Sequence, residues 1–552
     1  MSVGKIACWC FAGAVAAACI CESWRLPALA FGAEDGSRPI RAPRRAVERF
    51  VPRGERVTLL RVDCADSPSQ VCRQIFLSVA WAAGAGNVEE KRALDGTERY
   101  VVTAPFPAAP GSLAGNPHYR EHADSEFGRV WIRDDAPVAA SANDGVEKWR
   151  EVRGAGIAAV ARECGEWREA LGLVVPVLLS LALLAMGLGR MPSRVALLAA
   201  ATVFLTGAMF ALSHTFVGPC GTGVFGGRAR AFVESGFRFA KLADPKMGEY
   251  FQAAYPPLQA LVTAAGYLVA GMCGEWLTQL GPVMYLAAAV VAMDGMSRVG
   301  AQGPGCGTNR AIACALLASA CLTGPMLRAA GNFCAEPLMM LAVASGWAAL
   351  RRGCASGWLL VGLAAFAKNE GVFYVPAVFA AEAAAGRLRF RLREAAALAC
   401  GLVPAVTWHV GCRCAGASLY DYASPWQCDP SRAFAALCAL LQEAAIHPWR
   451  YAFVAVALAC AVRAWRAEGK GRVGAALRAA LPPFAFFVVC ATGICWAFSI
   501  SRAPDFAWHL SCLPRLLAPA SALALAEALS RERLDTNRML LLQLRQHEHE
   551  QQ

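Results

Sequence analysis

The chain has 552 residues, of which 57% are hydrophobic and 17% are charged. Its apolar residues gather into runs of roughly 16 to 22, about the length that a helix needs to cross a bilayer core. This pattern excludes a soluble globular protein. The formal net charge of +12 does not indicate nucleic-acid binding, because Lys and Arg lie in short clusters between apolar runs, as the positive-inside rule expects of cytoplasmic loops.

The first apolar run, from Ile6 to Cys21, has two possible identities: a signal-peptide core or a first transmembrane helix. The bulky and charged residues from Glu22 to Arg25 follow it where a small-residue cleavage site would stand. We therefore expect residues 1–24 to form an uncleaved membrane anchor. At the other end, the polar residues 531–552 are expected to form a cytoplasmic tail.

Residues 33–169 are polar, with Pro, Gly, Asp and Arg throughout and no run long enough to span a membrane. Alternating apolar residues predict strands in this region, and one stretch has helical periodicity. The sequence therefore predicts a small extracytoplasmic α/β domain. Its expected strands lie at 56–62, 99–105 and 128–134, and its expected helix at 69–83.

Residues 171–530 form a multi-pass region in which every basic cluster should be cytoplasmic, so an even number of crossings must separate any two clusters. Between Arg194 and Arg298, however, there are three apolar segments: 195–217, 256–269 and 277–296. The middle one opens with two prolines, so we assign it to a re-entrant or interfacial helix on the outer side. About twelve crossings remain, including 171–188, with both termini in the cytoplasm.

Three charged residues, Glu336, Lys368 and Glu370, lie in apolar surroundings near the predicted outer membrane face. Charges at membrane depth are costly and usually face a cavity or a partner. Two interpretations stay open for Lys368 and Glu370: an ion pair that stabilises a helix end, or the border of a site for a charged lipid headgroup.

Arg515 lies a short way into the last apolar run, on the predicted outer side, where the positive-inside rule does not account for it. A guanidinium in this place suits a phosphate, which it can hold by two parallel hydrogen bonds. The nearby His509 is either part of that site or only a polar neighbour.

Four motifs follow one another along the predicted outer face: YPPL at 255–258, AGNFCAEPL at 330–338, AKNEG at 367–371 and FAWHLSCLPRLL at 506–517. Together, over about residues 171–527, they resemble the GT-C membrane glycosyltransferases, in particular bacterial relatives of the protein mannosyltransferases and lipid A aminoarabinose transferases. This resemblance implies an all-α polytopic fold whose outer loops pass a sugar from a polyprenyl-phosphate carrier to an acceptor hydroxyl or amine.

The resemblance also implies roles for individual residues. Glu336 matches the acidic residue of the family's second outer loop and is the first candidate for the carboxylate that removes the acceptor's proton. Arg515, with Lys368, is expected to steady the leaving phosphate. The other expected substrate-binding residues are Glu370, Arg228, Arg230, Tyr255 and His509.

One feature of the family is missing. GT-C enzymes usually carry an acidic residue early in the first outer loop, ahead of an aromatic and a basic pair, and Phe225, Arg228 and Arg230 match only those later positions. The loop sequence GPCGTGVFGGRARAF contains no carboxylate. After Glu336, the candidates for the base are therefore later residues of the same loop, Asp244 and Glu249.

The expected partners are a polyprenyl-phosphate sugar donor, a lipid or glycan acceptor and membrane lipids, without nucleic acid. Use of a divalent metal at the leaving phosphate stays open. Two alternatives to a transferase also stay open: a catalytically inactive relative, and a transporter or flippase of lipid-linked sugars. The expected location is a bacterial cytoplasmic membrane, with the α/β domain in the periplasm; a eukaryotic origin would place that face in the endoplasmic reticulum lumen.

Overall fold

The computed structural model describes residues 46–137 and 167–530, apart from gaps at 48–49, 53–54, 62–87, 92–96, 105–112, 114–115, 126–127, 190, 213–223, 235–254, 272–276, 299–305, 415–426, 468–471, 502–505 and 507–509. The expected anchor at 1–24, the expected helix at 69–83 and the tail at 531–552 lie outside the described residues. The same is true of three expected site residues, Asp244, Glu249 and His509.

The N-terminal region contains a five-stranded mixed sheet with the order β2-β1-β3-β5-β4. Strand β1 pairs in parallel with β2 and β3, and β5 pairs antiparallel with β3 and β4. All three expected strands are confirmed, whereas β2 and β4 were not predicted. The strands are β1 Val57–Arg61, β2 Val88–Lys91, β3 Tyr100–Ala104, β4 Tyr119–Ser125 and β5 Gly128–Arg133.

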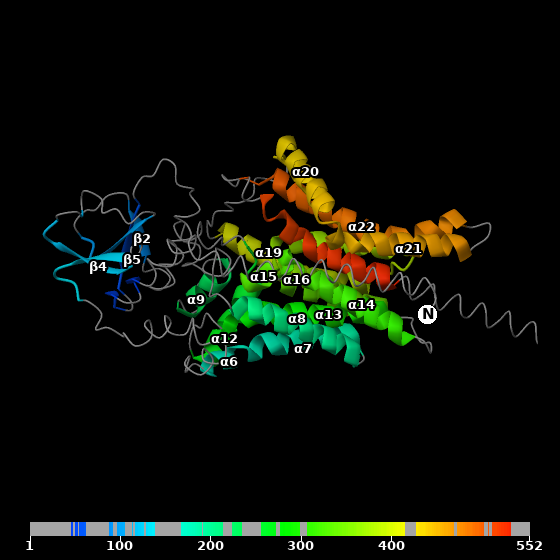
Figure 1. Cartoon of the computed structure of the whole chain (residues 1–552), viewed down its shortest axis with the longest axis horizontal. Helices are drawn as coiled ribbons and strands as arrows, with labels where there is room; N and C mark the ends of the chain where they lie inside the picture. Colours follow the sequence, from blue (N-terminus) through cyan, green and yellow to red (C-terminus); the bar gives the residue numbers. More distant parts are fainter. Residues whose placement is uncertain are drawn as a thin grey trace, which may run out of the picture.

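Both faces of this sheet are packed. Side chains alternate between the two faces along each strand, and each face has its own apolar cluster. Tyr100 and Val102 of β3 belong to one apolar cluster, while Val101 between them packs with Trp131 and Leu113 on the opposite face. The first cluster also contains residues from the helical part of the chain, such as Phe225 and Phe333. The sheet is therefore joined to one end of the helical body, as Figure 1 shows.

The rest of the described chain is helical. The elements are α6 Trp167–Gly172, α7 Val174–Leu188, α8 Arg194–Leu212, α9 Gly226–Glu234, α12 Leu258–Ala270, η2 Leu277–Gln279, α13 Leu280–Arg298, α14 Cys306–Cys321, α15 Gly324–Gly331, α16 Glu336–Arg351, α17 Ser356–Ala367, η3 Asn369–Phe373, α18 Tyr374–Ala384, α19 Leu392–Cys414, α20 Pro430–Ile446, η4 Pro448–Tyr451, α21 Ala452–Ala467 and α22 Arg472–Ser499. A final helix covers 513–530.

Several of these helices are suited to a membrane. Within the described ranges, five are long and apolar enough to cross a bilayer, or seven if each of two sharply bent helix pairs is one span. They include the expected crossings at the start of the region, at Ala170–Leu188, Arg194–Leu212 and Leu277–Ser297. The chain is thus a mostly helical protein with apolar spans and a small sheet near its N-terminus.

Helix α12 covers the segment that we expected not to cross. It has 13 residues, which corresponds to about 20 Å at 1.5 Å per residue, less than the roughly 30 Å of a bilayer core. Pro257 precedes its first turn, and Gly271 ends it with a left-handed backbone. Figure 1 shows α12 beside α6 and α9 at the end of the body that faces the sheet. Its length agrees with a re-entrant or interfacial helix.

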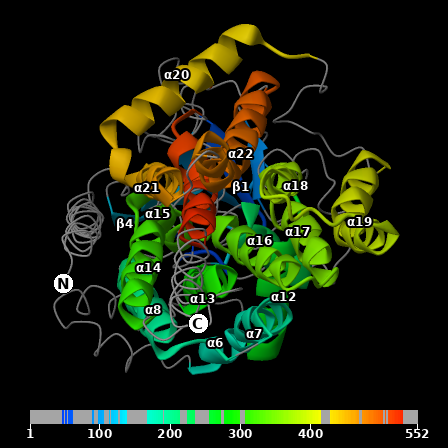
Figure 2. The ribbon, with the colours of Figure 1, turned by 90° about the vertical axis from the view of Figure 1, so that its right-hand side faces the viewer.

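Helix α16 lies at the centre of the helical body, with α13, α17 and α7 packed against it. Its residues from Glu336 to Ala349 are all buried. In Figure 2, which looks along the long axis, the other helices surround it, whereas α20 crosses their direction. Because α16 is 16 residues long, its ends are about 24 Å apart, and each end carries charged residues.

Two facing glycines bring α16 close to α17. A Cβ atom on Gly357 would lie 2.5 Å from the carbonyl oxygen of Gly346, and one on Gly346 would lie 2.7 Å from the carbonyl oxygen of Gly357. Small residues at such crossings let helix backbones approach closely in membranes. This contact fixes the relative position of the helices that carry Glu336 and Lys368.

We predict that Gly357→Ala lowers the free energy of unfolding by about 1–3 kcal/mol, because the added methyl group must push the two backbones apart. Thermal unfolding of the purified chain in one detergent measures this change. The control is Gly474→Ala, where the nearest atom to the new Cβ would be Nη1 of Arg478 at 3.4 Å. Equal unfolding temperatures for the two variants would contradict the close-packing argument.

Candidate functional site

The structure brings four of the predicted site residues into one cluster, in which three are buried and Arg515 is partly exposed. Oε1 of Glu336 lies 2.8 Å from Nζ of Lys368 and 2.9 Å from Nε of Arg515. Nζ of Lys368 is also 3.7 Å from Oε1 of Glu370. Glu336 is fully buried, and Lys368 and Glu370 are 4% exposed. Three distant segments thus meet in a formally neutral group, which we call the ion cluster.

Helix ends position these charges. Glu336 is the first residue of α16 and Lys368 immediately follows α17, so each charge has the sign that the helix dipole favours at that end. Arg515 lies in the first turn of the helix at 513–530, where the dipole disfavours a cation. Its place is therefore explained by its partners in the cluster and not by its own helix.

The turn before Glu336 has an unusual backbone. Phe333 has φ of 61°, the only described non-glycine residue with positive φ, and its side chain is buried. Bulky residues adopt this conformation rarely, and such strain concentrates at functional sites. The turn also aims Cys334 at the cluster, where its Sγ accepts a hydrogen bond of 3.2 Å from Nη1 of Arg515. Sequence reasoning singled out neither residue.

Several polar atoms of the cluster and its neighbouring turn have no hydrogen-bond partner among the described residues. They are Oε2 of Glu336, Oε2 of Glu370, Oδ1 of Asn369 and the hydroxyl of Tyr374. The ammonium of Lys368, which has three donors, makes one described hydrogen bond, to Glu336. Buried polar groups are normally satisfied. Among the described residues, this site therefore lacks hydrogen-bond donors for one oxygen of each carboxylate and acceptors for part of the Lys368 ammonium.

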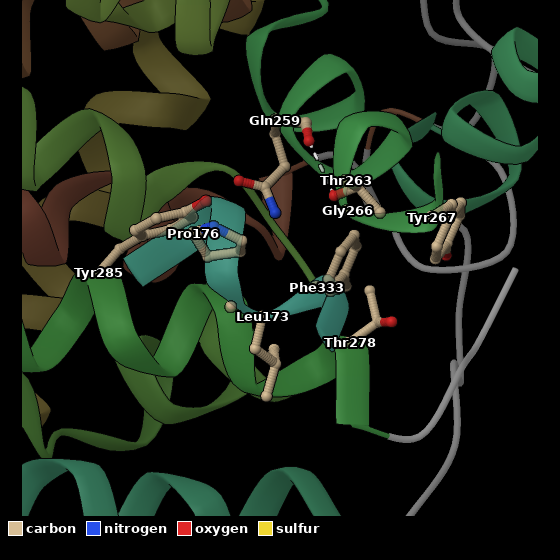
Figure 3. A pocket seen from close by; sticks show the side chains of 11 residues that line it. Leu173, Pro176, Gln259, Thr263, Gly266, Tyr267, Thr278, Tyr285 and Phe333 are labelled. Atoms are coloured by element: carbon tan, nitrogen blue, oxygen red, sulfur yellow. Dashed lines mark hydrogen bonds between the residues drawn. The ribbon is translucent and has the colours of Figure 1, made fainter. Parts of the chain in front are cut away.

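A neutral pocket is lined in part by Phe333, three residues before Glu336 (Figure 3). Leu173, Gln259 and Tyr285 are among its lining residues, and none of those residues is charged. Oε1 of Gln259 and the hydroxyl of Tyr285 are buried there without a described partner. None of the predicted site residues lines this pocket, so it is separate from the ion cluster.

Arg228 is fully buried and holds the YPPL turn. Its guanidinium donates to the carbonyl oxygens of Tyr255 at 2.8 Å and Pro256 at 3.1 Å, and it lies 5.9 Å from the ring centroid of Trp408. The substrate-binding role expected of Arg228 and Tyr255 stays a prediction. The observed contacts explain how α9 positions the start of α12. Arg230 lies two residues further along α9 and is partly exposed.

A second charged group lies at the other end of α16. Trp347 Nε1 donates to Oε1 of Glu382 at 2.7 Å, and Arg387 binds both oxygens of the same carboxylate, at 2.8 and 3.1 Å. Arg387 also reaches Glu527 at 3.2 Å, and Arg351 pairs with Glu527. Because both Glu382 oxygens are satisfied, we interpret this group as a structural tie between α16, α18 and the final helix.

Comparison with known proteins gave no relative: neither a family model, nor a curated protein, nor a solved structure matches the chain. The function must therefore be argued from the ion cluster itself.

We predict that Glu382→Ala lowers the free energy of unfolding by about 3–5 kcal/mol, because it leaves buried donors of Trp347 and Arg387 without their acceptor. Denaturant unfolding in detergent measures the loss. Arg393→Ala is the control: that side chain is 73% exposed in its pair with Glu394, so the change should stay below about 1 kcal/mol. A similar result for both variants would show that the tie does not stabilise the fold.

Proposed function

We propose that this chain is an integral-membrane glycosyltransferase that moves a sugar from a polyprenyl-phosphate carrier to an acceptor hydroxyl or amine. The observation that carries the proposal is the ion cluster, in which the cations Lys368 and Arg515 meet at one oxygen of Glu336 and two carboxylate oxygens, Oε2 of Glu336 and Oε2 of Glu370, have no described hydrogen-bond donor. A sugar phosphate offers both complements: phosphate oxygens for Lys368 and Arg515, and hydroxyl groups for Glu336 and Glu370.

The reaction needs few groups. The acceptor oxygen or nitrogen attacks the anomeric carbon, the bond from that carbon to the phosphate oxygen breaks, and the polyprenyl phosphate leaves with the electron pair. The acceptor's proton passes to a carboxylate, for which Glu336 is the first candidate. Lys368 and Arg515 offset the negative charge that develops on the leaving phosphate.

The position of the cluster supports a reaction on the face that carries the sheet. Phe333 and Ala335, which lie three residues and one residue before Glu336, belong to the same apolar cluster as Val57 and Tyr100 of the sheet. If the sheet is extracytoplasmic, as we propose, then so is the site. The proposal includes a GT-C-like domain of about twelve crossings with both termini in the cytoplasm, and a cell-membrane location.

Use of a divalent metal at the leaving phosphate stays open in this proposal. Among the described residues, no group of three or more His, Cys, Asp or Glu side chains is arranged to hold a metal ion. The guanidinium and the ammonium of the cluster themselves supply positive charge that stabilises the leaving phosphate.

We predict that membranes containing the chain transfer label from at least one radiolabelled polyprenyl-phosphate sugar in a panel of donors. Glu336→Gln and Arg515→Ala should each lower the rate by about 100-fold or more, since they remove a proton acceptor and a phosphate ligand. Glu394→Gln, an acidic residue paired with the exposed Arg393, is the control and should retain the rate.

Transfer that proceeds equally well in all variants would exclude the ion cluster as the catalytic site. Absence of transfer from every donor would exclude the transferase and leave the inactive relative or the transporter of lipid-linked sugars as the explanation.

A further inference from the structure

The ion cluster contains two cations that contact the same carboxylate oxygen. Oε1 of Glu336 lies 2.8 Å from Nζ of Lys368 and 2.9 Å from Nε of Arg515. A single carboxylate oxygen thus lies where a group with several anionic oxygens could contact the two cations through separate oxygens.

The second oxygen of Glu336 indicates that the carboxylate is not fully satisfied in its observed position. Oε2 is buried and has no described partner, although leaving such an atom unsatisfied costs free energy. Glu336 therefore gains its two ion pairs at the cost of an unsatisfied oxygen. Glu370 does not relieve the cations, since its contact with Lys368 is 3.7 Å, longer than a hydrogen bond.

We propose that Glu336 is an internal counterion that occupies the anion position between Lys368 and Arg515, and that a phosphate monoester or diester displaces it on binding. The inference rests on the proposed function only for the identity of the ligand. Its consequence for the reaction is an order of events: while Lys368 and Arg515 hold Glu336, the carboxylate is a poor proton acceptor, and donor binding releases it beside the acceptor.

The test is the affinity of the full chain in lipid nanodiscs for a polyprenyl monophosphate, measured by calorimetry, with inorganic phosphate as a second probe. Because Glu336→Gln removes the internal competitor and one negative charge a few ångströms from the ligand, it should lower Kd by roughly tenfold or more. Lys368→Met should raise Kd. Glu394→Gln, which removes a distant carboxylate, should leave Kd unchanged.

The two probes separate the sources of the phosphate group. Tightening for both probes would show that the site recognises phosphate itself, and tightening for the lipid alone would show that the prenyl chain is needed to deliver it. Either result supports the internal counterion. Weaker or unchanged binding in Glu336→Gln, or no binding of either probe to any form, would overturn it.

Glu336→Asp guards against a variant that does not fold. Its shortened carboxylate keeps the charge but cannot reach both cations at the observed distances, so its Kd should lie between those of the unchanged chain and Glu336→Gln; a Kd at or above that of the unchanged chain would overturn the inference. Binding is independent of sugar transfer. If transfer fails while the binding pattern holds, the proposed function is wrong and the internal counterion stands. If transfer is observed but the binding pattern fails, the internal counterion is wrong and the proposed function stands.

Discussion

The ion pairs of Glu336 with Lys368 and Arg515 tie together three helices that are far apart in the sequence. Buried charges are costly to leave alone, so α16, α17 and the helix at 513–530 must meet where these residues can neutralise one another. The close contact of α16 with α17 at Gly346 and Gly357 makes this meeting possible. The site and the packing of the helical body therefore depend on the same constraint.

The two buried carboxylates at the ends of α16 differ in their hydrogen bonds. At one end the oxygens of Glu382 are bound by Trp347 and Arg387, and the charges act as a structural tie. At the other end Glu336 is equally buried but keeps an oxygen without a described partner. A stable fold tolerates this deficit where a ligand completes the site.

The sequence predicted the parts of this protein that depend on local pattern. Alternation revealed β1, β3 and β5, and charges in apolar surroundings revealed Glu336, Lys368, Glu370 and Arg515. It missed β2, whose residues VEEK lack an apolar pattern, and Phe333, whose role depends on a backbone angle. It also could not show that Arg228 binds the carbonyl oxygens of Tyr255 and Pro256, because such partners are defined only by tertiary packing.

The most direct test of this account is the structure of the full chain in nanodiscs that contain a polyprenyl monophosphate, determined by electron cryo-microscopy. We predict density for the phosphate between Nζ of Lys368 and the guanidinium of Arg515, with the carboxylate of Glu336 turned away from both. A lipid phosphate bound elsewhere, with Glu336 still paired to both cations, would contradict the assignment of the ion cluster as the phosphate site.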